Sequence, residues 1–126
     1  MTDLIQAALE GQKKAYAPYS KYEVGAAILG EDGEIYSACN VENASLGLSI
    51  CAERSALFQM VAAGCHAVEA CAVATVDGGA PCGACLQVMQ EFARDPQKVS
   101  VTMVDAEGRQ TRRSLSELLP FPFSSF

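Results

Sequence analysis

The spacing of apolar residues along the chain predicts helices and strands in alternation. Residues 2–16, 51–63 and 83–93 carry apolar side chains at helical spacing. Short apolar runs bounded by turn residues predict strands at 24–29, 34–39, 68–76, 99–104 and 109–113. This order is typical of an α/β sandwich, in which helices cover both faces of one sheet.

The turns between these segments predict how the strands pair. Gly30-Glu31-Asp32-Gly33 has the composition of a hairpin turn, so the first two strands should be antiparallel neighbours. Helices between later strands favour parallel crossovers. The predicted fold class is therefore α/β, a three-layer sandwich with a mixed five-stranded sheet that begins with an antiparallel hairpin and continues with parallel strands. No linker or repeat interrupts residues 1–126, which predicts a single domain.

Two further signals mark expected helix ends. Ser49 is the expected N-cap of the helix at 51–63, and Gly64 is its expected C-terminal stop. Ser114-Leu115-Ser116-Glu117 has the spacing of a capping box, which predicts a closing helical turn.

Charge and hydropathy argue against two classes of partner. Nine Lys and Arg residues against fifteen Asp and Glu residues give a net charge of −6, which predicts no nucleic-acid partner. No apolar run approaches the roughly 18 residues that a membrane span needs, so no membrane partner is expected. Asp3 stands where a signal peptide would carry positive charge, and we therefore expect a cytoplasmic protein.

Six cysteines, at positions 39, 51, 65, 71, 82 and 85, carry the first chemical signal. In a reducing compartment this number indicates metal ligands, catalysis or simple burial rather than disulfides. Cys65 and Cys71 are expected to be small buried hydrophobic residues.

Three of the cysteines are expected to converge on one zinc ion. Cys82 and Cys85 lie three residues apart across a predicted helix start, and Cys51 lies at the start of another helix. The positive partial charge of helix N-termini favours thiolates. Zinc with three protein ligands keeps a fourth position for water, which is the catalytic arrangement.

Glu53 follows the first of these cysteines by two residues. At this spacing its carboxylate can face a water on the metal and carry a proton to a substrate. Cys-x-Glu followed later by Pro-Cys-x-x-Cys is the three-cysteine form of the zinc nucleobase deaminase pattern. Cys51-Ala52-Glu53 with Pro81-Cys82-Gly83-Ala84-Cys85 fits it.

Two other classes of function remain open at this point. A structural zinc module would use Cys39 as a fourth thiolate, and Glu53 would then have no role. A thiol-disulfide oxidoreductase would use Cys82 and Cys85 as a redox pair without metal.

The sequence resembles the small, homotetrameric cytidine deaminases of pyrimidine salvage over nearly its whole length. The motifs that carry the resemblance are Ala17-Pro18-Tyr19-Ser20, Val24-Gly25-Ala26-Ala27, Asn40-Val41-Glu42-Asn43-Ala44-Ser45, Cys51-Ala52-Glu53-Arg54, Pro81-Cys82-Gly83-Ala84-Cys85 and Leu118-Leu119-Pro120. Six ordered motifs are far more specific than a single Cys-x-x-Cys.

The resemblance implies hydrolytic deamination of cytidine and 2′-deoxycytidine to the uridine forms and ammonia, by zinc-activated water with Glu53 as proton shuttle. It implies Zn²⁺ as cofactor, a nucleoside substrate, and a homotetramer with sites near subunit interfaces. The assigned residues are the zinc ligands Cys51, Cys82 and Cys85 and the substrate-binding residues Tyr22, Asn40, Val41, Glu42, Ala52 and Phe123.

Within this set, Asn40 and Glu42 match the family's ribose-binding pair, although they could instead hold a loop by turn hydrogen bonds. Tyr22 stands where the family usually has a phenylalanine beside the pyrimidine. The main chain of Ala52 would contact the base carbonyl. Phe123 matches an aromatic residue that reaches a neighbouring subunit's site.

The chain departs from the family pattern at Leu46, where a tyrosine is common, and at Leu86, where an arginine usually follows the last cysteine. Arg54 is therefore expected to tune the charge of the zinc site alone. The alternative function is that of a related zinc deaminase acting on another aminated pyrimidine nucleoside, such as blasticidin S.

Overall fold

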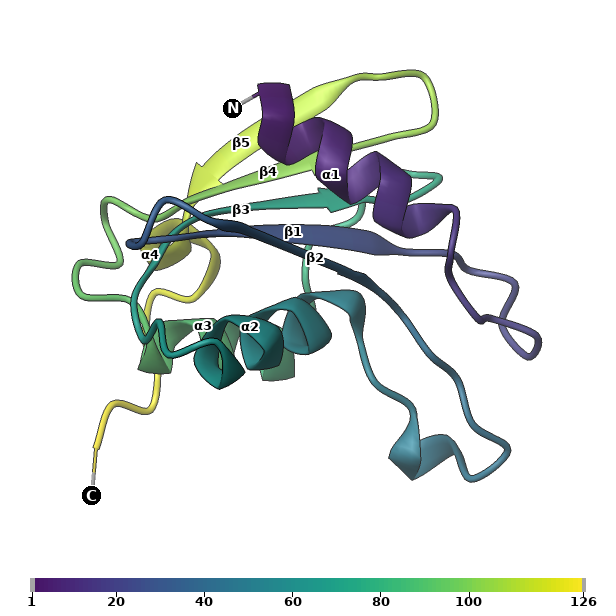
Figure 1. The fold of residues 1–126 in the computed structure, drawn as a ribbon, viewed down its shortest axis with the longest axis horizontal. Coiled ribbons are helices and arrows are strands. Elements are labelled where there is room, and N and C mark those ends of the chain that lie inside the picture. Colours follow the sequence, from purple (N-terminus) through teal and green to yellow (C-terminus); the bar gives the residue numbers. More distant parts are fainter. Residues whose placement is uncertain (1, 126) are drawn as a thin grey trace.

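A mixed five-stranded sheet forms the middle layer of the computed structural model, which describes residues 2–125 (Figure 1). Its strands, in the order β2-β1-β3-β4-β5, are β1 (Gly25–Gly30), β2 (Ile35–Cys39), β3 (Val68–Ala74), β4 (Ser100–Val104) and β5 (Gln110–Ser114). Helix α1 (Thr2–Gln12) covers one face, and α2 (Ala52–Ala62) and α3 (Gly83–Glu91) cover the other. The 3-10 helix η1 (Leu46–Leu48) and the short helix α4 (Leu115–Leu118) complete the fold. The predicted fold class is confirmed.

The expectation of parallel strands after the leading hairpin holds for one pair only. β3 and β4 are parallel, whereas β1 pairs antiparallel with both β2 and β3, and β4 pairs antiparallel with β5. Parallel neighbours need a crossover of a dozen or more residues. The connection from β3 to β4 contains α3 and is long enough, whereas the segment 105–109 between β4 and β5 allows only a hairpin.

Side chains of different size fill the two faces of the sheet. The side covered by α2 and α3 holds the large core residues, among them Ile28, Leu57, Met60, Val73, Met89 and Val101. The side covered by α1 is lined mainly by alanines, namely Ala8, Ala27, Ala70, Ala72 and Ala74, together with Leu4. Because alanine side chains are short, α1 lies close to the strands.

Two glycines make this close approach possible. A Cβ at Gly25 would lie 2.0 Å from the carbonyl oxygen of Ala8, and one at Gly11 would lie 2.5 Å from the carbonyl oxygen of Ala38. Both oxygens belong to the backbone, so neither contact could be relieved by a side-chain rotation. The packing of α1 on β1 and β2 therefore requires glycine at both positions.

We expect Gly25→Ala to lower the free energy of unfolding by about 3 kcal/mol, because α1 must move off the sheet to admit the methyl group. Urea unfolding of the zinc-loaded protein measures this change. Gly47→Ala is the matched control, since a Cβ there meets nothing within 4 Å, and its effect should stay within about 0.5 kcal/mol. Equal stabilities of the two variants would contradict this account of the α1 contact.

The helix ends differ from the sequence expectation in two places. Helix α1 ends at Gln12 rather than near Tyr16, whose N–H donates instead to the carbonyl oxygen of Asn40. Helix α2 has Cys51, not Ser49, as its N-cap, because the Ser49 hydroxyl accepts a hydrogen bond from the N–H of Asn43 at 3.1 Å.

The other helix ends match more closely. Helix α3 begins at the predicted residue and ends at Glu91, with Cys82 as its N-cap. The capping box of Ser114 and Glu117 is confirmed, with reciprocal hydrogen bonds of 3.1 and 2.8 Å. Within residues 2–125, no helix combines the length and the apolar character that a membrane crossing requires.

Candidate active site

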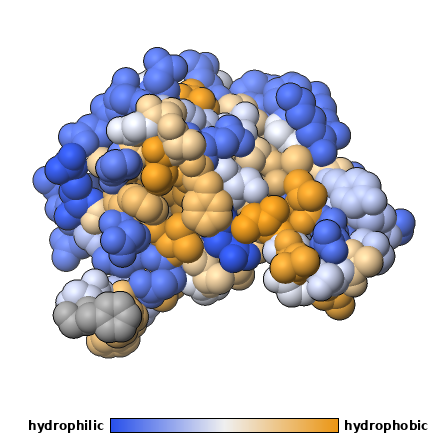
Figure 2. Space-filling model, turned by 60° about the horizontal axis from the view of Figure 1, so that its bottom comes forward, coloured by the Kyte–Doolittle hydropathy of each residue, from blue (hydrophilic) through white to orange (hydrophobic). Residues whose placement is uncertain are grey.

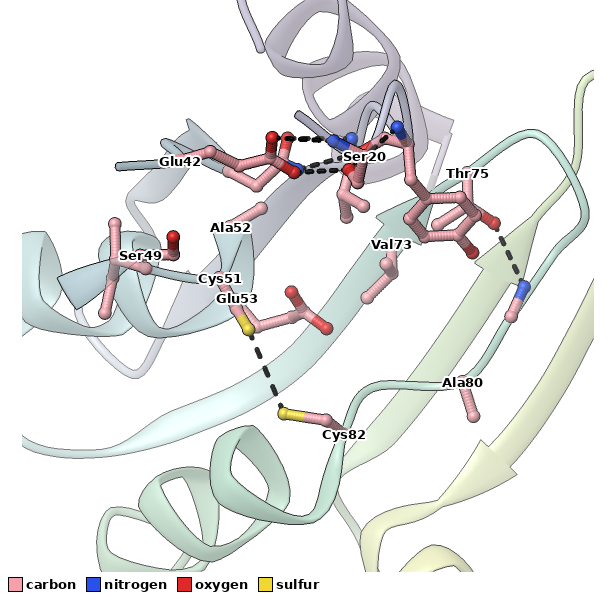
Figure 3. A pocket seen from close by; sticks show the side chains of 15 residues that line it. Ser20, Glu42, Ser49, Cys51, Ala52, Glu53, Val73, Thr75, Ala80 and Cys82 are labelled. Atoms are coloured by element: carbon pink, nitrogen blue, oxygen red, sulfur yellow. Dashed lines mark hydrogen bonds between the residues drawn. The ribbon is translucent and has the colours of Figure 1, made fainter. Parts of the chain in front are cut away.

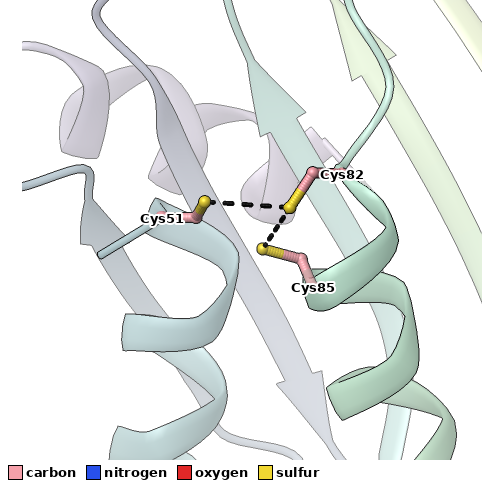
Figure 4. A group of neighbouring side chains, drawn as sticks. All are labelled: Cys51, Cys82 and Cys85. Carbon is pink, nitrogen blue, oxygen red and sulfur yellow. Dashed lines mark hydrogen bonds between the residues drawn. The ribbon is translucent and has the colours of Figure 1, made fainter. Parts of the chain in front are cut away.

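Three cysteines meet where the N-termini of α2 and α3 lie side by side (Figure 4). The Sγ atom of Cys82 is 3.9 Å from that of Cys51 and 3.5 Å from that of Cys85. Cys51 and Cys82 are the N-caps of their helices, and neither helix has a side-chain hydrogen bond at its cap. The positive helix ends therefore face the thiols. Within residues 2–125 this is the one group of His, Cys, Asp and Glu side chains placed to hold a metal ion.

The donor set fits zinc. Tetrahedral zinc with Zn–S bonds of about 2.3 Å holds its sulfurs about 3.8 Å apart, close to the two distances observed. The structural-zinc alternative lacks its fourth ligand, because the Cys39 thiol donates to the carbonyl oxygen of Lys14 at 3.3 Å and lies outside the cluster. The three thiols therefore suit a site with an open fourth position.

Arg54 contacts the cluster directly. Its guanidinium Nη2 donates to the Sγ atom of Cys51 at 3.3 Å. Hydrogen bonds from Cys85 and from Arg54 lower the pKa of the Cys51 thiol, while the bond to Cys51 and burial raise the pKa of Cys85. Leu86, next to these ligands in sequence, is buried in the hydrophobic core and is 6% exposed. Leu86 therefore offers no cation to the sulfurs, and among the described residues Arg54 is the cation that an observed hydrogen bond places at one of them.

Glu53 lies in the first turn of α2 and is only 4% exposed. In Figure 3 its carboxylate points into the space between Cys51, Cys82 and Val73. Burial raises the pKa of this carboxyl to about 7. A carboxyl so placed faces the open side of the metal site without belonging to the ligand cluster.

A pocket of about 320 Å³ opens above the cysteines and Glu53. It lies at the carboxyl end of β3 and is bordered by the loop before β1. Its walls include the predicted residues Tyr22, Asn40, Glu42, Cys51, Ala52, Glu53 and Cys82. Most of the side chains that the sequence assigned to metal, proton transfer and substrate thus share one cavity, whereas the buried metal ligand Cys85 lies behind its wall.

Two predicted substrate-binding residues do not line this pocket. Val41 is 45% exposed, and its backbone pairs with Ile50. Phe123 lies in the C-terminal segment and is 61% exposed, and its N–H and C=O both bond to the side chain of Gln87. Neither side chain contributes to the cavity of its own chain.

Asn40 and Glu42 hold the loop that carries Tyr22. The Glu42 carboxylate accepts from the N–H groups of Tyr19 and Ser20, at 2.9 and 3.0 Å, and from the Ser20 hydroxyl (Figure 3). The Asn40 amide accepts from the N–H of Val24 at 3.0 Å and donates to the carbonyl oxygen of Tyr22 at 2.8 Å. Asn40 and Glu42 therefore do hold a loop by hydrogen bonds, as the alternative reading of the sequence predicts. Each side chain still has hydrogen-bonding capacity left for a ligand.

Eight residues of the pocket are not among the predicted site residues, namely Ser20, Val24, Ser49, Ile50, Val73, Thr75, Gly79 and Ala80. Thr75 offered a signal, because it is a polar residue at the end of the apolar run of β3. It is 4% exposed and bonds within the following loop. The other seven residues show no pattern in the sequence that indicates a place in the pocket.

The sequence matches the cytidine and deoxycytidylate deaminase zinc-binding region over residues 1–103. The chain belongs to this deaminase family. A cytidine deaminase of Sporosarcina psychrophila is 42% identical over 123 residues, covering 96% of this chain and 89% of that protein. One of Halalkalibacterium halodurans is 43% identical over 124 residues, covering 97% and 92%.

Solved structures agree with this assignment. The crystal structure of cytidine deaminase from Burkholderia pseudomallei superposes with a TM-score of 0.89 at 46% identity, covering 97% of this chain and 98% of that one. Membership in the cytidine deaminase family confirms the resemblance found in the sequence. It also favours a zinc enzyme over a metal-free redox pair.

Proposed function

We propose that this chain hydrolyses cytidine and 2′-deoxycytidine to uridine and 2′-deoxyuridine plus ammonia, in cytoplasmic pyrimidine salvage. The observation that carries the proposal is the shared pocket, where the buried Glu53 carboxylate and two members of the cysteine cluster, Cys51 and Cys82, line the same cavity as Asn40 and Glu42. An aminated base attached to a ribose is a substrate that uses all of these groups. Its amine can lie at the end of the pocket that holds the metal site, and its sugar hydroxyls can lie at the end that holds Asn40 and Glu42.

Cys51, Cys82 and Cys85 hold zinc in this proposal, and zinc with an open position supplies an activated water as nucleophile for C4 of the pyrimidine. Glu53 would pass one proton of the water to N3 and then the second proton, from the oxygen now bonded to C4, to the amine, which leaves as ammonia while the C4 oxygen becomes the carbonyl of uridine. The Ala52 main chain contacts the base carbonyl, as the family resemblance implies.

The substrate range tests the proposal directly. We expect loss of ultraviolet absorbance with cytidine and deoxycytidine, and far slower loss with free cytosine, because a base without sugar leaves Asn40 and Glu42 without partners. Turnover of blasticidin S in place of both nucleosides would favour the alternative deaminase. No turnover of any aminated pyrimidine by zinc-loaded protein would overturn the proposal.

Glu42→Gln should raise the KM for cytidine about tenfold with little change in kcat, since it removes one acceptor for a sugar hydroxyl and leaves the proton path intact. Steady-state kinetics with cytidine measure both constants. The matched control is Glu34→Gln, an exposed carboxylate in the β1–β2 turn outside the pocket. Equal KM values for the two variants would remove Glu42 from ribose binding.

The assembly is also part of the proposal. Figure 2 shows apolar side chains gathered on the side of the molecule that carries α2 and α3. The exposed large apolar residues of the described chain include Leu46, Leu48, Phe58, Phe121 and Phe123. Such a surface supports an interface between copies of the chain. We expect light scattering to give four times the chain mass, with Phe123 near a neighbouring site. A fully active monomer would contradict this prediction.

A further inference from the structure

Tyr22 is the aromatic residue that lines the pocket, and its hydroxyl group forms a hydrogen bond to a different segment of the pocket wall. The Tyr22 hydroxyl donates to Oδ1 of Asp77 at 2.6 Å. Tyr22 belongs to the loop before β1, and Asp77 to the loop between β3 and α3, 55 positions further along the chain. The bond therefore joins two separate walls of the pocket.

Two further hydrogen bonds hold the Asp77 carboxylate, the acceptor of this bond, in place. The same Oδ1 atom accepts from the Thr75 hydroxyl at 3.2 Å and from the N–H of Gly79 at 3.1 Å. The N–H of Gly79 also bonds to the Thr75 hydroxyl at 3.0 Å (Figure 3). A Cβ at Gly79 would lie 2.9 Å from the Tyr22 hydroxyl oxygen. The loop thus offers a carboxylate and the space that a tyrosine, rather than a phenylalanine, needs.

The main chain of Tyr22 is fixed as well. Its N–H donates to the Ser20 hydroxyl at 3.0 Å, and its carbonyl oxygen accepts from the Asn40 amide at 2.8 Å. Lys21, with a φ of 62°, is the one non-glycine residue of the described chain with positive φ. This strained turn lets Ser20 face Glu42 while Tyr22 faces the cavity. Hydrogen bonds therefore hold Tyr22 both at its backbone and at its side-chain hydroxyl.

We infer that Asp77 is a positioning residue for the deamination, one that fixes the Tyr22 ring as a rigid wall of the nucleoside pocket. The hydroxyl is bonded to Asp77, so the ring offers the substrate its apolar surface. The bond also ties this wall to the loop that leads into Cys82. A wall already ordered before binding spares the substrate part of the entropic cost of ordering it. The inference rests on the proposed function for the identity of the ligand.

A double-mutant cycle on the zinc-loaded, full-length protein tests this role. Tyr22→Phe and Asp77→Ala, which remove the donor and the acceptor of this bond, should each raise the KM for cytidine, and the dissociation constant of the product uridine, about threefold to tenfold. The value of kcat should stay within about twofold, because the metal ligands and Glu53 are untouched. The double variant should be no worse than either single one, because both changes break the same bond.

The chain supplies its own control. Tyr36 donates to Oδ2 of Asp32 at 2.5 Å, a second tyrosine–aspartate bond, which lies outside the pocket. Tyr36→Phe and Asp32→Ala should leave KM and uridine affinity unchanged. The inference is overturned if the Tyr22 and Asp77 variants also leave both constants unchanged, or if their effects multiply in the double variant. Calorimetry with uridine decides this without turnover, whereas wild-type inactivity toward cytidine would overturn the proposed function instead.

Discussion

Glu53→Gln is expected to reduce turnover of cytidine by at least about 10²- to 10⁴-fold, with zinc and fold retained. Glutamine has nearly the same shape, but it cannot take up and release the proton that the reaction moves. Glu53 is 4% exposed, and a neutral amide at that place costs less to bury than a charge, so the variant should fold. The measurements are kcat by ultraviolet absorbance and zinc by atomic emission.

Glu69→Gln is the matched control for this prediction. Glu69 is an exposed carboxylate of β3, and it lies outside the pocket. Its activity should equal that of the wild type. Turnover of the Glu53 variant near the wild-type rate, with zinc bound in both, would remove Glu53 from the mechanism.

Cys85→Ala is expected to abolish both zinc binding and turnover. Cys85 is fully buried in the first turn of α3, and its loss leaves only two thiols at the site. Because the metal binds the folded chain, its loss also removes stability, about 4 kcal/mol when free zinc exceeds its dissociation constant a thousandfold.

Cys65→Ala controls for the loss of a buried cysteine as such. Cys65 is 8% exposed and packs in the core away from the pocket. It should keep zinc and activity, and its melting temperature should respond to added zinc as the wild type does. If Cys85→Ala still binds zinc and turns over cytidine, the three-cysteine site is wrong.

The order of elements and the zinc cluster were predictable because each depends on local pattern. The apolar spacing of residues 2–12 and 52–62 defines two helices, and the capping box at Ser114 defines a third helix start. The Cys-x-Glu and Pro-Cys-x-x-Cys motifs place three thiols at two helix N-termini. The convergence of these termini follows once both helices pack on the same sheet face.

Contacts between distant segments were beyond the sequence. Nothing local to Tyr22 or Asp77 indicates that they meet, because their bond depends on where β1 and β3 lie in the sheet. Leu86 stands next to the metal ligands in sequence, but the turn of α3 directs it into the core. The prediction of Ser49 as the N-cap of α2 is wrong, because the Ser49 hydroxyl bonds to its own loop instead.

The most direct test of the central claim is a product balance with cytidine as substrate. Zinc-loaded protein should form uridine and ammonia in equal amounts, a chelator that strips the metal should stop both, and restored zinc should return both. Protein that carries one zinc per chain and leaves cytidine unchanged would contradict the account.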